Sequence, residues 1–247
     1  MKQVIAFSNH KGGVGKTTSV VNIASVLAET GKRVLVIDID PQGGASLHLG
    51  VRDNGAEFLK ALERTVAAPV LPTSVRGVDL IPSGSALFEA AQRFSGVLGA
   101  ELLARCLERT HGDWELVLID CPPGPGILTL GALRVSQHVV IPIEANRLAV
   151  NGLDQFIETL DSMRRKDRHP GVLGIIPCRA NPRLRLHREI MADLESRFPG
   201  MVAPLVRENV ALAEAPAQGK PITLYAPGSN GAEDYRRVAR WLLKRLG

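Results

Sequence analysis

The sequence lacks cysteine clusters of metal-ligand spacing and long apolar runs of the kind that span membranes. Its cysteines are few and isolated, without metal-ligand spacing, so Cys106, Cys121 and Cys178 are most simply structural thiols. No apolar run approaches the roughly 18 residues that a membrane-spanning helix needs. The first apolar segment leads directly into a glycine-rich loop, so we expect no signal peptide. Apolar residues make up 45% and charged residues 22% of the chain, the composition of an ordinary cytosolic globular protein.

A glycine-rich loop near the N-terminus is the most informative stretch. Residues 8–18 connect an apolar run, residues 4–7, to a segment with apolar residues at helical spacing, residues 19–28. Strand, glycine loop and helix form the context of a phosphate-binding loop, because glycines let backbone amides turn inward and a helix N-terminus attracts anions. In such a loop Lys16 reaches the β- and γ-phosphates and the Thr17 hydroxyl binds Mg²⁺. A plain glycine turn is the alternative interpretation.

One position departs from the general pattern G-x-x-x-x-G-K-[ST]. His10 stands where the first glycine is expected, and Lys11 adds a second cation. Because Lys16 already serves the loop's own nucleotide, Lys11 could reach a nucleotide held by a second subunit. The segment resembles the signature K-G-G-x-G-K-[ST]-T of the deviant Walker-A ATPases, the ParA/MinD family. The resemblance implies an ATP-dependent homodimer with two ATP molecules at its interface, and these nucleotide-binding residues: Lys11, Gly12, Gly13, Val14, Gly15, Lys16, Thr17 and Thr18.

Acidic residues follow two further apolar segments that are typical of buried parallel strands. Residues 33–38 end in Asp38, with Asp40 two positions later, and residues 115–120 end in Asp120. The ends of such strands are where open α/β sheets bind ligands, and an apolar strand ending in aspartate is the Walker-B arrangement that holds Mg²⁺. Two capping acids at a turn are the alternative for Asp38 and Asp40. The resemblance implies that Asp40 is catalytic with Lys11 and Lys16, that Asp38 supports the loop and the metal, and that Thr17, Asp38 and Asp120 form the metal site.

The remaining strand and helix patterns complete an α/β fold. Residues 78–82, 138–143 and 171–178 indicate further strands, and residues 57–66, 86–106 (broken near 96–99), 152–165 and 234–246 have helical periodicity. The fold class that they predict with the glycine loop is that of P-loop NTPases: a mostly parallel, twisted β-sheet with helices on both faces. We expect residues 1–247 to form a single domain, without a helix-turn-helix before the loop.

Positive charge is concentrated in the C-terminal part of the chain. Residues 147–247 hold 17 Lys and Arg against 11 Asp and Glu, which favours an anionic partner, although arginines on solvated faces would give the same balance. On the resemblance to ParA-like proteins, Asn181 is the candidate adenine contact and Arg183, Arg185 and Arg188 are candidate DNA contacts. Arg236 and Arg240 lie on the basic side of the last helix, which could contact DNA, pack as an exposed basic face, or bind membranes as in MinD-like relatives.

The resemblance implies a DNA-partitioning ATPase of chromosomes or plasmids with weak intrinsic activity. ATP and Mg²⁺ would drive dimerisation and binding to non-specific double-stranded DNA, and a ParB-like adaptor would stimulate hydrolysis and release. We expect a cytoplasmic, nucleoid-associated protein without stable membrane association. A membrane-cycling MinD-like positioning ATPase and an ATPase that positions a non-DNA cargo are the alternatives.

Overall fold

A central sheet, mostly parallel, organises the computed structural model, which describes residues 2–94, 96–164 and 170–247. In the described part of the chain the sheet has seven strands in the order β3-β4-β2-β5-β1-β6-β7. The short edge strand β3 pairs antiparallel with β4, and the other pairs are parallel. The strands are β1 (Gln3–Phe7), β2 (Val34–Asp38), β3 (Leu71–Pro72), β4 (Val78–Ile81), β5 (Leu116–Asp120), β6 (His138–Glu144) and β7 (Gly171–Cys178).

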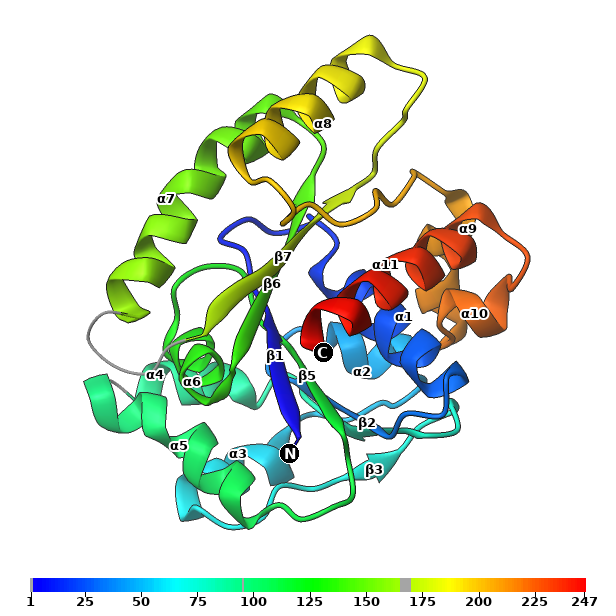
Figure 1. The fold of residues 1–247 in the computed structure, drawn as a ribbon. Helices are drawn as coiled ribbons and strands as arrows, with labels where there is room; N and C mark the ends of the chain where they lie inside the picture. Colours follow the sequence, from blue (N-terminus) through cyan, green and yellow to red (C-terminus); the bar gives the residue numbers. More distant parts are fainter. Residues whose placement is uncertain (1, 95, 165–169) are drawn as a thin grey trace.

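Helices cover both faces of the sheet (Figure 1). They are α1 (Lys16–Glu29), α2 (Gly44–His48), α3 (Ala56–Arg64), α4 (Leu87–Arg93), α5 (Gly96–Arg109), α6 (Ile127–Val135), α7 (Arg147–Arg164), α8 (Arg185–Arg197), α9 (Val210–Glu214), the 3₁₀ turn η1 (Ala215–Gln218), α10 (Ile222–Tyr225) and α11 (Asn230–Leu246). The predicted fold class is therefore confirmed.

The core consists of two apolar clusters, one on each face of the sheet, because alternate side chains of the buried strands point to opposite faces. In β1, Val4 and Ala6 pack with α3 to α8, whereas Ile5 and Phe7 pack with α1, α2, α10 and α11. Successive strand residues point to opposite faces, so strands that are apolar throughout require helices on both sides. This sandwich holds the carboxyl ends of β1, β2 and β5 side by side, where the site is built.

The structure differs from the predicted elements mainly at helix ends. Helix α7 begins at Arg147 rather than at residue 152, because the Asn146 side-chain carbonyl caps it by accepting the Ala149 N–H at 2.8 Å. Helix α11 begins at Asn230, four residues before its predicted start, behind Ser229, whose hydroxyl accepts the Ala232 N–H. The sequence did not predict the short α2, α9 and α10, nor α6 and α8.

Candidate nucleotide-binding site

The glycine loop lies between β1 and α1, as predicted. Gly13 and Gly15 have φ values of +73° and +96°, a region that favours glycine, and a Cβ on Gly15 would lie 3.1 Å from the Cys178 Sγ. The loop is anchored at its start, where the Asn9 side-chain amide donates to the Pro142 carbonyl at 2.8 Å. The backbone therefore curls at the N-terminus of a fourteen-residue helix, the geometry that binds phosphate.

Lys16 lies inside this loop rather than in solvent. Its side chain is buried, and the ammonium Nζ donates to the Lys11 carbonyl at 2.8 Å. Burial lowers the pKa of Lys16, and the nearby charges of Asp120 and Asp40 oppose that shift. The ammonium is thus held against the backbone of the glycine loop, at the Lys11 carbonyl.

Asp38 and Asp120 end adjacent strands as neighbours in register and are both completely buried. Burial raises the pKa of Asp120 well above its ordinary value, and the charge of Asp38 raises it further. The Thr17 hydroxyl donates to Asp120 Oδ2 at 2.7 Å, whereas Asp120 Oδ1 is buried without a hydrogen-bond partner among the described residues. An orphaned carboxylate oxygen beside a threonine hydroxyl fits Mg²⁺, which prefers oxygen ligands and would offset two adjoining negative charges.

The two other acids of the site have different surroundings. Asp38 Oδ2 accepts the backbone N–H and the hydroxyl of Ser46 at 2.8 and 2.7 Å, and Oδ1 accepts the Asp40 N–H. Burial raises the pKa of Asp38 to about 6, although these hydrogen bonds oppose the shift. Asp40 is only partly buried, and its Oδ1 accepts the Gln42 N–H at 2.9 Å. Protein groups thus hold Asp38 in place, while Asp40 stays partly accessible to water.

Lys11 differs from Lys16 in its surroundings. Its side chain is exposed and makes no hydrogen bond or ion pair to the described residues, while its N–H donates to the Asn9 side-chain carbonyl. His10, in the place of the missing glycine, packs edge-on against Phe156 of α7 with ring centroids 4.7 Å apart. The Lys11 ammonium, the second cation of the loop, is therefore exposed and unpaired within the part of the chain that the structure describes.

Sequence reasoning missed two buried serines behind the acids. Ser46 begins the contact with Asp38, and Ser83 follows β4 and donates its hydroxyl to the Asp40 carbonyl at 2.7 Å. Ser46 lies six residues after Asp40, and this closeness in sequence to the predicted acids is its sequence signal. No local pattern indicates Ser83, because it approaches from another strand.

The candidate adenine and DNA contacts lie after β7. The Asn181 side-chain carbonyl accepts the Arg183 N–H at 3.0 Å and so shapes the turn into α8. Arg183 is exposed, and its guanidinium has no partner in the described ranges. Arg185 is also exposed but pairs with Glu189, and the guanidinium of Arg188 donates to the carbonyls of Pro182 and Arg183. These arginines form one exposed cluster at the start of α8.

The structure does not bring Arg236 and Arg240 to that cluster. They lie on α11, while the start of α8 is at the top of the view in Figure 1. The Arg236 guanidinium forms two hydrogen bonds to Glu29 of α1 and one to the Pro227 carbonyl, and Arg240 Nε donates to the Arg236 carbonyl. Arg236 is therefore committed within the fold, and Arg240 is the more available of the two.

The apolar side of α11 is used for packing. Tyr235, Val238 and Leu242 are buried in the core cluster that also contains α1. A membrane-binding helix needs a free apolar face, and this face is covered. Over the residues that the structure describes, no helix has the length and apolar character needed to cross a membrane.

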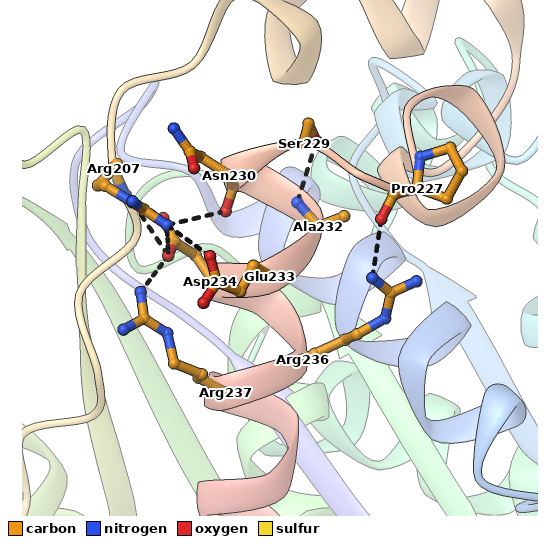
Figure 2. Close-up of polar contacts among 9 residues, drawn as sticks. All are labelled: Arg207, Pro227, Ser229, Asn230, Ala232, Glu233, Asp234, Arg236 and Arg237. Atoms are coloured by element: carbon orange, nitrogen blue, oxygen red, sulfur yellow. Dashed lines mark hydrogen bonds and ion pairs between the residues drawn. The ribbon is translucent and has the colours of Figure 1, made fainter.

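An ion network fixes the segment before α9 to α11, as Figure 2 shows. The Asp234 carboxylate is completely buried and accepts the backbone N–H of Arg207 at 2.9 Å and its guanidinium at 2.8 Å. Arg237 also pairs with Asp234, and Glu233 pairs with Arg207. Arg207 bridges in parallel to Ala180, so the network holds the turn after β7, which carries Asn181, in a defined place.

A phosphate loop after β1, with aspartates at the ends of the adjoining parallel strands, defines a P-loop nucleoside triphosphatase. The family profile described as AAA domain matches residues 2–170. Sporulation initiation inhibitor protein Soj of Bacillus subtilis is 36% identical over 97% of this chain and 98% of its own length. Chromosome-partitioning ATPase Soj of Thermus thermophilus is 38% identical over 98% of this chain and 96% of its own.

The chain belongs to the ParA/Soj/MinD family of ATPases. Among solved structures, cobyrinic acid a,c-diamide synthase from Mycobacterium smegmatis with bound ADP and magnesium is similar, with a TM-score of 0.82 and 30% identity. The match covers 100% of this chain and 96% of that one. The predicted family is thus confirmed, while the roles of individual site residues stay predictions.

Proposed function

We propose that this protein is a DNA-partitioning ATPase that closes into a dimer around two ATP molecules. The observation that carries the proposal is the exposed Lys11 side chain, without a partner in the described residues, beside a loop that Lys16 already serves. A free cation at the outer side of a phosphate loop suits a partner subunit's nucleotide. Closure would then depend on the triphosphate, because its charge joins the two protomers.

Three side chains divide the work of hydrolysis. Lys16 binds the β- and γ-phosphates, Lys11 contacts the partner's phosphates, and Asp40 orients the water that attacks the γ-phosphorus. The water oxygen forms a bond to that phosphorus as the bond to the β,γ-bridging oxygen breaks, so that ADP and inorganic phosphate leave and the water proton passes to solvent. Thr17 and Asp120 would hold Mg²⁺, which when bound would supply positive charge to the phosphate oxygens.

Dimerisation would place two copies of the α8 arginine cluster on one DNA duplex. Non-specific affinity comes from counterion release, with a log–log salt slope of about −0.9 per phosphate contacted. If each protomer makes about three contacts, the slope doubles, from about −2.7 to about −5.4, when ATP joins two protomers. Hydrolysis would separate the protomers and release DNA, a step that we expect a ParB-like adaptor to stimulate. The covered apolar face of α11 disfavours the membrane-cycling alternative.

The test is sedimentation of the protein with Mg²⁺ and a non-hydrolysable ATP analogue. We expect the wild-type chain to form dimers and Lys11→Ala to bind the analogue but remain monomeric. Lys2→Ala is the matched control, because Lys2 is an exposed lysine at the opposite end of β1. Wild-type dimerisation of Lys11→Ala would refute the role of Lys11 across the interface, and single chains at saturating nucleotide in the wild type would refute the proposed function.

A further inference from the structure

Ser83 connects the two strand-end acids of β2 from behind. It lies two residues after β4 and is completely buried. Its hydroxyl donates to the Asp40 carbonyl at 2.7 Å, and its N–H donates to the Ser46 hydroxyl oxygen at 3.0 Å. One residue thus touches the Asp40 backbone and the group that holds Asp38.

The hydrogen bonds that link Ser83, Ser46 and the two acids have a fixed donor and acceptor order. The carboxylate of Asp38 can only accept, so the Ser46 hydroxyl donates its single proton to Oδ2. The Ser46 oxygen is therefore the acceptor for the Ser83 N–H, and the Ser83 hydroxyl keeps its own proton for the Asp40 carbonyl. Each of these three donors makes one hydrogen bond. The order cannot be reversed, because the Asp38 carboxylate and the Asp40 carbonyl have no proton to donate.

The turn that follows Asp40 also packs closely against the backbone of Ser83. Gly43 has a φ of +64°, and a Cβ at that position would lie 2.9 Å from the Ser83 carbonyl oxygen. The Gly43 N–H also donates to the Asp40 carbonyl at 2.8 Å, which closes the turn. The Asp40 carbonyl thus has two donors, one from its own turn and one from Ser83, which ties the carbonyl to the segment after β4, while Asp38 Oδ1 holds the Asp40 N–H.

We propose that Ser83 is a positioning residue for ATP hydrolysis, which fixes the Asp40 backbone so that the carboxylate stands where the attacking water must be held. The inference rests on the proposed function, in which Asp40 orients that water. The Asp40 carboxylate has one hydrogen bond among the described residues, to the N–H of Gln42 in its own turn. Its location therefore follows from where the backbone is held.

The experiment compares Ser83→Ala and Ser83→Cys with the wild type and with Asp40→Ala. Alanine removes the hydroxyl donor, and cysteine keeps a side chain at that place with a much weaker S–H donor. Both variants retain the backbone N–H that serves Ser46. Ser85→Ala is the matched control, because Ser85 is exposed two residues further on. Single-turnover phosphate release gives the rate, and titration with a non-hydrolysable ATP analogue gives the affinity.

We expect Ser83→Ala and Ser83→Cys to lower the hydrolysis rate roughly 3- to 10-fold, the value of one neutral hydrogen bond. Nucleotide affinity and ATP-dependent dimerisation should stay within about twofold of wild type, since the phosphate loop is untouched. A merely structural serine would instead weaken affinity and rate together, and that result overturns the proposal. So does a wild-type rate in both variants.

Asp40→Ala separates this inference from the function on which it rests. If Asp40→Ala is inactive while both Ser83 variants hydrolyse ATP normally, the positioning role of Ser83 is refuted and the proposed function is not. If Asp40→Ala turns over ATP at the wild-type rate, the catalytic role of Asp40 falls, and the role of Ser83 falls with it.

Discussion

We expect acid to destabilise this protein through His48, a buried histidine of α2 that the sequence did not single out. Its side chain is 1% exposed, and its Nε2 has no hydrogen-bond partner among the described residues. Burial lowers the pKa of His48 to about 4, although a hydrogen bond to the Lys220 backbone opposes the shift. In the unfolded chain the same imidazole titrates near pH 6.5.

The direction of the pH effect on the free energy of unfolding follows from the number of protons that each state binds. Between pH 6.5 and about 4 the unfolded chain binds a proton at His48 and the folded protein does not, so the free energy of unfolding falls as the pH falls. A gap of about 2.5 pKa units corresponds to roughly 3 kcal/mol, present above pH 6.5 and lost by about pH 4. Asp38, with its pKa raised to about 6, and Asp120, whose pKa is also raised, oppose this loss, because the folded protein binds extra protons at both carboxylates.

The variant His48→Gln separates the contribution of His48 to the pH dependence of stability from that of the buried carboxylates. We expect the stability difference between wild type and His48→Gln to decrease by roughly 3 kcal/mol between pH 7 and pH 4, measured by urea unfolding. Glutamine is neutral throughout, so its packing defect does not change with pH. The exposed His111 provides the control variant His111→Gln, for which the difference should stay constant. A constant difference for His48→Gln would refute the assignment.

Two further predictions concern the charged residues of the C-terminal part. Asp234→Asn should lower the free energy of unfolding at pH 7 by roughly 3 kcal/mol, because Arg207 loses its buried partner. The pKa of Asp234 is lowered in the fold despite burial, chiefly by hydrogen bonds from Arg207. The deficit is therefore full above pH 3.8 and shrinks as acid protonates the wild-type carboxylate, which urea unfolding across acidic pH will show. Arg183→Ala should make the salt slope of ATP-dependent DNA binding shallower by about 2, one contact per protomer, whereas Arg236→Ala, whose guanidinium is bound to Glu29, should change it less.

The sequence predicted those parts of the site that depend on strand ends. Parallel strands that are buried on both faces end at one edge, so apolar runs ending at Asp38 and Asp120 were sufficient to bring these acids together with the glycine loop. The predicted strands from β1 to β7 followed from the same apolar runs, apart from the two-residue β3. These contacts follow from topology alone.

Contacts between side chains distant in sequence could not be predicted. Ser83 meets Ser46 across 37 positions, and Arg236 meets Glu29 across 207, and neither pair has a spacing that a sequence pattern reveals. Helix α6 is largely apolar and so lacks the contrast between faces on which periodicity depends, while α8 buries only Ile190 and Leu194. Short helices such as α9 and α10 form because tertiary packing holds them.

Three carboxylates share one site, and their surroundings divide the roles among them. Asp38 is fully buried and receives three hydrogen bonds from Ser46 and Asp40, so the protein itself satisfies most of its acceptor capacity. Asp120 is equally buried, yet one oxygen has no partner in the described chain, which leaves a position for an ion. Asp40 is partly exposed with its backbone pinned by Ser83, which suits a group that must meet water. A buried charge without a partner is costly, and burial accordingly raises the pKa of Asp120; a cation would offset the same cost, so we expect the metal at Asp120 and the attacking water at the more accessible Asp40.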